Sequence, residues 1–463
     1  MDDVRTIVDD LTQRHLLVQD GPETWAFVSE LVRETVLHGI LGVQRRDQHL
    51  LVASALETLY ADALEPWHET LAHHCAAGGR IVDAARYAHM AGQRMESAQF
   101  LDRALAAYRR GLGWLEQAPE QASTWDARTQ GEAMLRYRIG TLNITMGDAA
   151  RGERDLQLAL DISSDAGLPW IEVRAHVALG ESYMQRGRLG LAQAHLRQAQ
   201  AMLAFEDDPE LTRVCLEARA SLALIEGRQD EASALWEQIL ATAGSDPAVR
   251  GRCLAGLARR QLQSDDVDTA RDYLDEALAA AMSANDRILQ GQIENNLGIV
   301  AARERRFDDA LDWFRRALQT REGIGYRRGV ITNHHNIGDI HFQREDYDRA
   351  WVAFERSREL AAQIDWEVGV ALNDVFMGYI EARTDAASGR ARIEAARQRA
   401  AALSDHETHA TGTWLLARSY AESGEDAAAA ALFDESVTEA ESTGLTGLAR
   451  SIEASRDEVS PSD

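Results

Sequence analysis

Small residues recur at long, regular intervals along the chain from residue 140 onward, and most of them follow an apolar residue. They are Gly140, Gly180, Ala220, Ala258, Gly298, Gly338, Gly378 and Ala417, at spacings of 40, 40, 38, 40, 40, 40 and 39 residues. Twelve residues after most of them comes an alanine, and sixteen residues after comes a large apolar side chain. Such a register indicates an internal repeat.

Each repeat predicts a pair of packed helices. The small residue lets two helices approach closely, while the alanine and the bulky residue after it form a knob and a hole on the second helix. The chain of 463 residues has only seven prolines and 6% aromatic residues, and it lacks the alternation of β-branched residues that strands need. The sequence therefore predicts an all-α array of stacked helix pairs.

The pattern resembles the tetratricopeptide repeat. Its two clearest copies are Asn296-Leu297-Gly298 with Phe307, Ala310 and Phe314, and Asn336-Ile337-Gly338 with Tyr347, Ala350 and Phe354. The period near 40, against the usual ~34, is similar to the long repeats of kinesin light chains and of bacterial peptide-sensing modules. The resemblance implies a right-handed α-α superhelical solenoid over residues 128–445.

The register departs from this pattern in several places. Gly152 stands where alanine is expected, and residues 384–396 are out of step around Gly389, which predicts a kink or a shortened helix there. The pattern over residues 63–127 predicts atypical helical repeats. Two overlapping registers of small and bulky residues fit this segment, and one of them is marked by Gly92 and Tyr108. Residues 118–126 carry proline and serine and predict a loop between helices.

The first 62 residues have a different rhythm. A helix is expected over 4–14, then two short strands over 15–18 and 24–28 around a polar turn, and then helices over 29–41 and 45–60. This order predicts a degenerate winged-helix-like cap over 1–62 that contains one β-hairpin. At the other end, residues 446–463 predict a capping helix and a disordered tail, since terminal repeats need polar covers.

Residues 4–74 resemble the segment after the nucleotide-binding domain of bacterial signalling ATPases that carry repeat arrays. The resemblance rests on Leu16-Leu17, Trp25-Ala26-Phe27, Glu34, Leu41, Arg46, Ala55-Leu56-Glu57 and Leu71-Ala72-His73-His74. Ser29 stands where that family usually has histidine. The resemblance implies that an ancestral ATPase was lost or that the chain is the C-terminal part of a longer protein.

Charge excludes several functions. The chain has 49 basic and 75 acidic side chains, a net charge of −26, and no lysine, so every basic residue is arginine. A phosphate-binding P-loop, a protein-kinase ATP site and a Schiff-base enzyme each need a lysine. An acidic surface also repels phosphodiester backbones, and residues 1–62 carry eleven acids against five arginines. We therefore expect no nucleic-acid partner.

No candidate catalytic or metal site emerges from the remaining motifs. His68 and His73 are five residues apart, hence about 140° apart on a helix, while His406 and His409 lack a visible third ligand. The three cysteines form no C-x-x-C motif, and no apolar run reaches the about 18–20 residues of a membrane helix. We expect a cytoplasmic protein that is not an enzyme, needs no cofactor or metal and binds no membrane.

The candidate binding site lies on the predicted first helices, which line the concave face of such solenoids. Residues three before and one after the small residue are expected to point into the groove. The candidates are Arg259, Asn295, Asn296, His335, Asn336, Asp339, Tyr379, Trp414 and Arg418. In the families resembled, asparagines on first helices grip a peptide main chain, a role that carries over to Asn295, Asn296 and Asn336. The alternative is that these asparagines bond neighbouring helices inside the array.

These observations favour a non-catalytic scaffold or adaptor that binds a peptide or partner protein in the concave groove. The alternative is the sensor or regulatory arm of a bacterial signalling ATPase or Ser/Thr kinase system, acting in trans or as a C-terminal fragment. The sequence does not indicate an oligomeric state.

The absence of lysine generates the first prediction. We expect the purified chain to bind no ATP, because no ammonium group is present to pair with the β- and γ-phosphates. Equilibrium binding of a labelled ATP analogue with magnesium tests this expectation. A micromolar site would show that the lysine argument is wrong.

Overall fold

A computed structural model describes residues 2–21, 24–39, 42–117, 125–203, 208–242, 244, 246–403, 405–443 and 445–459. The chain forms two compact units. One unit takes residues 1–94 and 106–131, and the other takes residues 95–105 and 132–463. Each unit is described by itself.

The first unit begins with α1 (Asp2–Gln13), β1 (Leu17–Gly21), β2 (Thr24–Phe27), α2 (Glu30–Gly39) and α3 (Gly42–Leu59). The two strands are antiparallel, with Leu17 opposite Phe27 and a register irregularity between Gln19 and Gly21. Ser29 starts α2, since its Oγ accepts a hydrogen bond from the N–H of Val32 at 3.3 Å. The predicted order of helix, hairpin and helix is confirmed, while turn residues 22–23 lie outside the described residues.

Next come a short 3-10 helix η1 (Glu65–Trp67) and the helices α4 (His68–Gly78), α5 (Ile81–Ser97) and α6 (Leu101–Gln117). Helix α3 is tied to α4 and α5, because Arg46 donates to the carbonyl of Gly78 at 2.9 Å and Arg80 pairs with Glu57 at 2.9 Å. The overlapping repeat register marked by Gly92 and Tyr108 corresponds to a packing contact between α5 and α6. The Tyr108 ring is fully buried and lies where a Cβ on Gly92 would be 2.2 Å from it.

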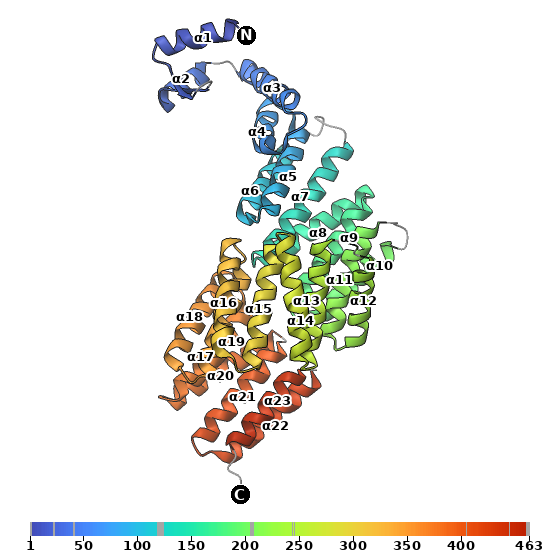
Figure 1. The fold of residues 1–463 in the computed structure, drawn as a ribbon, viewed down its shortest axis with the longest axis vertical. Helices are drawn as coiled ribbons and strands as arrows, with labels where there is room; N and C mark the ends of the chain where they lie inside the picture. The colour runs from blue at the N-terminus through green and yellow to red at the C-terminus, as the bar shows by residue number, and fades with distance from the viewer. Residues whose placement is uncertain are drawn as a thin grey trace. The chain divides into compact units, whose positions relative to one another are not determined.

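The second unit repeats one helix pair many times (Figure 1). The small residues of the register all lie on the first helices, which are α7 (Trp125–Thr145), α9 (Pro169–Gln185), α11 (Pro209–Ile225), α13 (Pro247–Gln263), α15 (Arg287–Arg303), α17 (Arg327–Gln343), α19 (Glu367–Ala382) and α21 (His406–Glu422). The second helices are α8 (Ala149–Ala166), α10 (Leu189–Leu203), α12 (Gln229–Thr242), α14 (Val267–Ser283), α16 (Phe307–Gly323), α18 (Tyr347–Gln363), α20 (Ala386–Ala402) and α22 (Asp426–Ser442). The predicted all-α solenoid with a small N-terminal hairpin is confirmed.

The turns inside the pairs follow a common rule. After each of α7, α9 and α11, a glycine takes a left-handed backbone, with φ of +98° at Gly147, while Asp265, Arg305 and Glu345 take it in the next three pairs. An aspartate then starts several second helices. Asp266, for example, accepts a hydrogen bond from the N–H of Thr269 at 3.2 Å. These residues end one helix and begin the next within a few positions.

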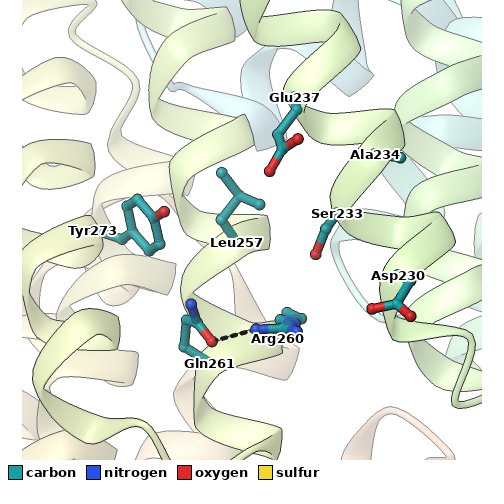
Figure 2. Close-up of a pocket in the computed structure, with 8 residues that line it drawn as sticks. All are labelled: Asp230, Ser233, Ala234, Glu237, Leu257, Arg260, Gln261 and Tyr273. Atoms are coloured by element: carbon teal, nitrogen blue, oxygen red, sulfur yellow. Dashed lines mark hydrogen bonds between the residues drawn. The ribbon is translucent and has the colours of Figure 1, made fainter.

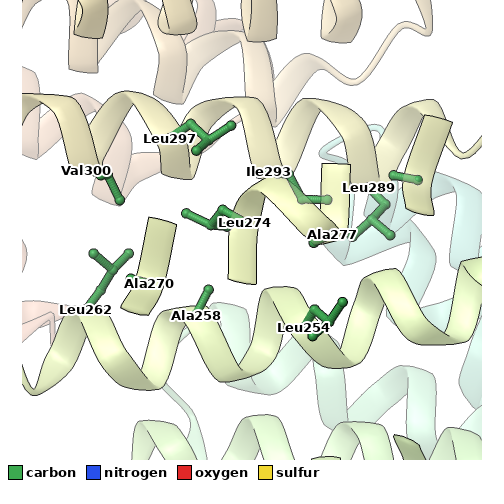
Figure 3. Close-up of a cluster of buried hydrophobic side chains, with 11 residues drawn as sticks. Leu254, Ala258, Leu262, Ala270, Leu274, Ala277, Leu289, Ile293, Leu297 and Val300 are labelled. Atoms are coloured by element: carbon green, nitrogen blue, oxygen red, sulfur yellow. The ribbon is translucent and has the colours of Figure 1, made fainter. Parts of the chain in front are cut away.

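The buried core lies where a second helix inserts between two first helices. Figure 3 shows one such cluster, in which Leu274 of α14 lies between Ala258 of α13 and Leu297 of α15. Leu274 and Ala258 are fully buried. Since burying a leucine side chain contributes about 1.5–3 kcal/mol, the repetition of this contact along the unit contributes to its stability.

The irregular pair α19–α20 corrects one expectation. Helix α20 is continuous and has 17 residues, so it is not shortened; the missing residue belongs to α19, which has 16. Gly389 takes the place of the usual alanine. A Cβ on Gly389 would be 2.4 Å from the carbonyl oxygen of Gly378 and 2.2 Å from the nitrogen of Ala382. The two backbones thus approach more closely than alanine allows.

The remaining expectations concern the ends of segments. The predicted loop at 118–126 is partly wrong, because α7 already begins at Trp125, and residues 118–124 lie outside the described residues. Within the predicted capping helix and tail at 446–463, residues Thr446–Val459 form α23, and residues 460–463 lie outside the described residues. No described helix is long and apolar enough to span a bilayer.

The close approach at Gly389 generates a prediction. We expect Gly389→Ala to lower the free energy of unfolding by about 1–3 kcal/mol, since the added methyl group meets backbone atoms that cannot yield as a flexible side chain would. Urea denaturation measures the change. The matched control is Gly113→Ala in α6, where a Cβ meets nothing within 4 Å; it is expected to stabilise by about 0.5–1 kcal/mol. Equal effects of the two substitutions would contradict the packing argument.

Candidate functional site

One register position forms a row along the first helices of the second unit. We call it the +1 row, since each member directly follows the small residue of its repeat. Its members are Thr141, Glu181, Ser221, Arg259, Ile299, Asp339, Tyr379 and Arg418. The sequence-predicted residues Arg259, Asp339, Tyr379 and Arg418 belong to it, whereas Glu181 and Ser221 were not predicted although they share the register.

Arg259 of α13 has an exposed side chain. Its Nη2 donates to Ser221 Oγ at 3.4 Å, and its guanidinium lies 5.9 Å from the centre of the Trp236 ring. Burial by the surrounding protein lowers the pKa of Arg259. Among the described residues no carboxylate lies within 4.0 Å of this guanidinium, so its charge is available to a ligand.

Glu181 of α9 is also exposed. Burial, followed by the nearby Glu217 carboxylate, raises the pKa of Glu181 to about 7, and Arg252 opposes the shift only in part. Arg252 itself pairs with Glu217 at 3.2 Å. The Glu181 side chain is exposed to solvent on one side and surrounded by protein on the others, as on a concave surface, so it is accessible and partly desolvated at the same time.

The predicted asparagines meet around a buried arginine. Arg321 of α16 is 5% exposed, and its Nη1 donates to Asn333 Oδ1 at 2.6 Å, to the carbonyl of Gly329 at 2.9 Å and to Asn295 Oδ1 at 3.4 Å. Asn295, 7% exposed, also accepts from Asn333 Nδ2 at 3.2 Å and from Asn336 Nδ2 at 2.9 Å. Burial lowers the pKa of Arg321 to about 10. Asn295 therefore has a structural partner set.

Asn296 differs from its neighbour. Its side chain is half-buried, and no described residue makes a hydrogen bond with its amide. A side-chain amide offers two donors and an acceptor. Of the three predicted asparagines, Asn296 is the one whose amide stays open to a ligand.

His335 and Asp339 lie one turn apart on α17. His335 Nδ1 is 3.1 Å from Asn373 Oδ1, and its ring packs against Phe354 and Phe376 with centroids 5.3 and 5.2 Å away. Asp339 accepts a hydrogen bond from Gln343 at 2.8 Å. Burial lowers the pKa of His335 and raises the pKa of Asp339, so both groups are displaced toward their neutral forms.

Tyr379, Trp414 and Arg418 come together at the C-terminal end of the row. The Arg418 guanidinium lies 4.8 Å from the Tyr379 ring centre and 5.9 Å from that of Trp414. The Tyr379 ring is fully buried, and its hydroxyl donates to Glu422. The structure thus brings these three predicted residues into one aromatic and cationic cluster, while Arg259 lies four repeats earlier.

The histidine motifs differ in their partners, and His68 Nδ1 is buried without a hydrogen-bond partner among the described residues. His406 Nδ1 and His409 Nδ1 both lie near the Glu439 carboxylate, at 3.3 and 2.5 Å, and His74 Nδ1 is 2.8 Å from His49 Nδ1. Within the described ranges, no group of three or more His, Cys, Asp or Glu side chains is placed to hold a metal ion. Cys75, Cys215 and Cys253 are buried free thiols.

The helix pairs, their register and the hairpin define a tetratricopeptide-type solenoid. Residues 289–363 match the sequence profile of the tetratricopeptide repeat family, which confirms the resemblance drawn from the register. A search of curated proteins gives no significant match. A tetratricopeptide solenoid is in general a non-catalytic interaction fold.

Solved structures with the same fold include a Rap protein complexed with Competence and Sporulation Factor, with a TM-score of 0.58, 13% identity, and coverage of 78% of this chain and 99% of that chain. Aspartyl phosphate phosphatase F from Bacillus subtilis gives a TM-score of 0.50 at 13% identity, covering 78% of this chain and 93% of that chain. Identities this low show the fold alone.

A signal transduction ATPase from Pyrococcus horikoshii with a tetratricopeptide repeat sensor also matches. The TM-score is 0.36 at 12% identity, with coverage of 96% of this chain and 60% of that chain. A TM-score of this size carries no argument about function. The resemblance of residues 4–74 to the region after an ATPase domain therefore stays a prediction.

The asparagine network generates the third prediction. We expect Asn295→Ala to lower the free energy of unfolding by about 1–3 kcal/mol, since Arg321, Asn333 and Asn336 each lose an acceptor. Asn296→Ala is the matched control on the same helix and should leave stability within about 0.5 kcal/mol. Urea denaturation of both variants is the measurement. If Asn295→Ala is as stable as the control, the network is not structural.

Proposed function

We propose that the chain is a non-catalytic scaffold whose first helices bind an extended peptide or a segment of a partner protein. The observation that carries the proposal is the +1 row, in which charged groups without an ion-pair partner, Arg259 and Glu181, stand on first helices of nearby repeats. An isolated charge costs free energy in a desolvated setting. A ligand of matching polarity would offset that cost.

The contacts around the row support an extended ligand rather than a small one. Arg259, Asn296 and Arg418 lie on α13, α15 and α21, so a ligand that meets them all must follow several repeats. Main-chain amides and carbonyls of a peptide recur every few ångströms and suit side chains such as Asn296. The Rap protein of similar fold was solved with Competence and Sporulation Factor, which supports the use of this fold in complexes.

A second candidate function is the regulatory arm of a signalling ATPase or kinase system. The N-terminal order of helix, hairpin and helix favours it, and so do the large apolar side chains exposed on those elements. Leu31, Val43 and Leu51 are 73%, 74% and 71% exposed. An adjoining ATPase or kinase gene would favour this candidate over a free adaptor.

The scaffold proposal generates the fourth prediction. A partner is first captured from a lysate of the native host, identified by mass spectrometry and prepared as a synthetic segment. We expect the double variant Arg259→Gln with Asn296→Ala to weaken its binding at least tenfold, about 1.4 kcal/mol. The reason is that one charge-assisted and one neutral hydrogen bond are lost. Isothermal titration calorimetry measures the affinity.

The control is Arg315→Gln on the exposed side of α16, where the guanidinium pairs with Asp312 at 3.3 Å and with no other carboxylate among the described residues. It removes the same charge away from the row and should leave affinity unchanged. Circular dichroism melting shows that both proteins are folded. Unchanged binding by the double variant would remove Arg259 of the +1 row and the nearby Asn296 as ligand contacts.

A further inference from the structure

A second set of equivalent positions lies where each second helix meets the first helix of the next repeat. Each junction has one residue from each helix. The second helix contributes the residue that follows its register alanine, for example Ser233 after Ala232. The next first helix contributes the residue two positions after its small residue, for example Arg260 after Ala258. Ser182 Oγ donates to Glu153 at 2.8 Å, and Arg390 Nε donates to Ser419 Oγ at 3.1 Å. The seven junction pairs are Glu153 with Ser182, Gln193 with Leu222, Ser233 with Arg260, Arg271 with Val300, Leu311 with Ile340, Trp351 with Ile380, and Arg390 with Ser419.

The junction of Ser233 and Arg260 is unlike the other six. In those six, the second helix contributes a long side chain, and the first helix contributes serine or an aliphatic residue. At the exceptional junction the second helix contributes the short Ser233 and the first helix contributes the long Arg260. The charged Arg260 side chain occupies the position at which Leu222, Val300 and Ile340 are buried in other repeats. The short Ser233 leaves space between α12 and α13 that no neighbouring side chain fills.

That space is a pocket of about 240 Å³. Its walls come from three consecutive helices, and the lining residues are Asp230, Ser233, Ala234 and Glu237 of α12, Leu257, Arg260 and Gln261 of α13, and Tyr273 of α14. Figure 2 shows Arg260, Gln261 and Asp230 toward one end of the pocket and Glu237 at the other. The pocket therefore holds one guanidinium and two carboxylates, and the Glu237 carboxylate lies at the end away from Arg260.

The polar groups of the pocket have unused bonding capacity. Arg260 Nε is buried without a hydrogen-bond acceptor, and Nη1 donates to Gln261 Oε1 at 2.7 Å. Among the described residues, no ion pair within 4.0 Å joins Arg260 to a carboxylate, and none joins Asp230 or Glu237 to a cation. A guanidinium binds carboxylates through two parallel hydrogen bonds. The arrangement can hold a negative group at one end and a positive group at the other.

We propose that this pocket binds a free α-amino acid. The ligand carboxylate pairs with Arg260, the ammonium group pairs with Glu237, and the side chain lies against Leu257 and the Tyr273 ring. A plain anion is opposed by Asp230 and Glu237, and a plain cation is opposed by Arg260, whereas a zwitterion satisfies both ends. The volume of about 240 Å³ admits a single amino acid. The site is separate from the +1 row and does not depend on the scaffold proposal.

The test titrates the full chain with each of the twenty standard amino acids by isothermal titration calorimetry. We expect saturable binding of at least one of them. Arg260→Leu restores the residue type of the other repeats and removes the carboxylate partner, so the affinity should fall at least tenfold. Ser233→Leu fills the pocket while Arg260 remains, and a similar loss is expected.

The charge-matched control is Arg228→Leu, which lies just before α12 and pairs with Glu226 and Glu231 outside the pocket. It should bind as the unmodified chain does. Thermal melting of each variant reports folding, and if Arg260→Leu does not fold, Ser233→Leu decides the question. The proposal is overturned if none of the twenty amino acids binds, or if folded Ser233→Leu binds as tightly as the unmodified chain.

Discussion

The close contact between the small residue of each first helix and the bulky residue of its second helix is the constraint on which the solenoid depends. At Gly298 a Cβ would be 2.5 Å from the Phe314 ring, and at Gly180 it would be 2.9 Å from Leu196. Only a small residue admits the ring or the isobutyl group at that depth. Because the contact recurs once per repeat, the same packing solution pairs the helices throughout the second unit, together with the register alanine of each second helix.

This constraint explains why the fold was predictable from the sequence. Small, alanine and bulky positions occur at fixed offsets, and that register gives both helices and their pairing without knowledge of distant contacts. It also explains the error at α20. The shift at Gly389 corresponds to one residue fewer in α19, which has 16 residues, whereas α20 has 17. A register read from the sequence alone does not distinguish a shorter first helix from a shorter second one.

The candidate site was predictable only in part, because side-chain partners come from other repeats. Register arguments place Asn295 on the correct helix, but its bonding partners Arg321, Asn333 and Asn336 lie 26, 38 and 41 residues away. The same arguments give no hint that Tyr379 turns its hydroxyl to Glu422, 43 residues on. A polar residue at a register position indicates a departure from the apolar packing rule. The three-dimensional contacts decide whether its hydrogen-bonding groups are taken up by a buried network or remain available to a ligand.

Arg259 and Arg260 show how one helix can serve two surfaces. Consecutive residues on an α-helix point about 100° apart, so Arg259 reaches the +1 row while Arg260 reaches the pocket between α12 and α14. The neighbouring Ala258 is fully buried and belongs to the same core cluster as Leu274, which fixes the position of α13 between its partners. Both guanidiniums are thus presented by a rigid backbone. The second position after the small residue is buried in other repeats, as at Leu222, Val300 and Ile340, so Arg260 replaces a core side chain, and the pocket lies where that apolar packing is missing.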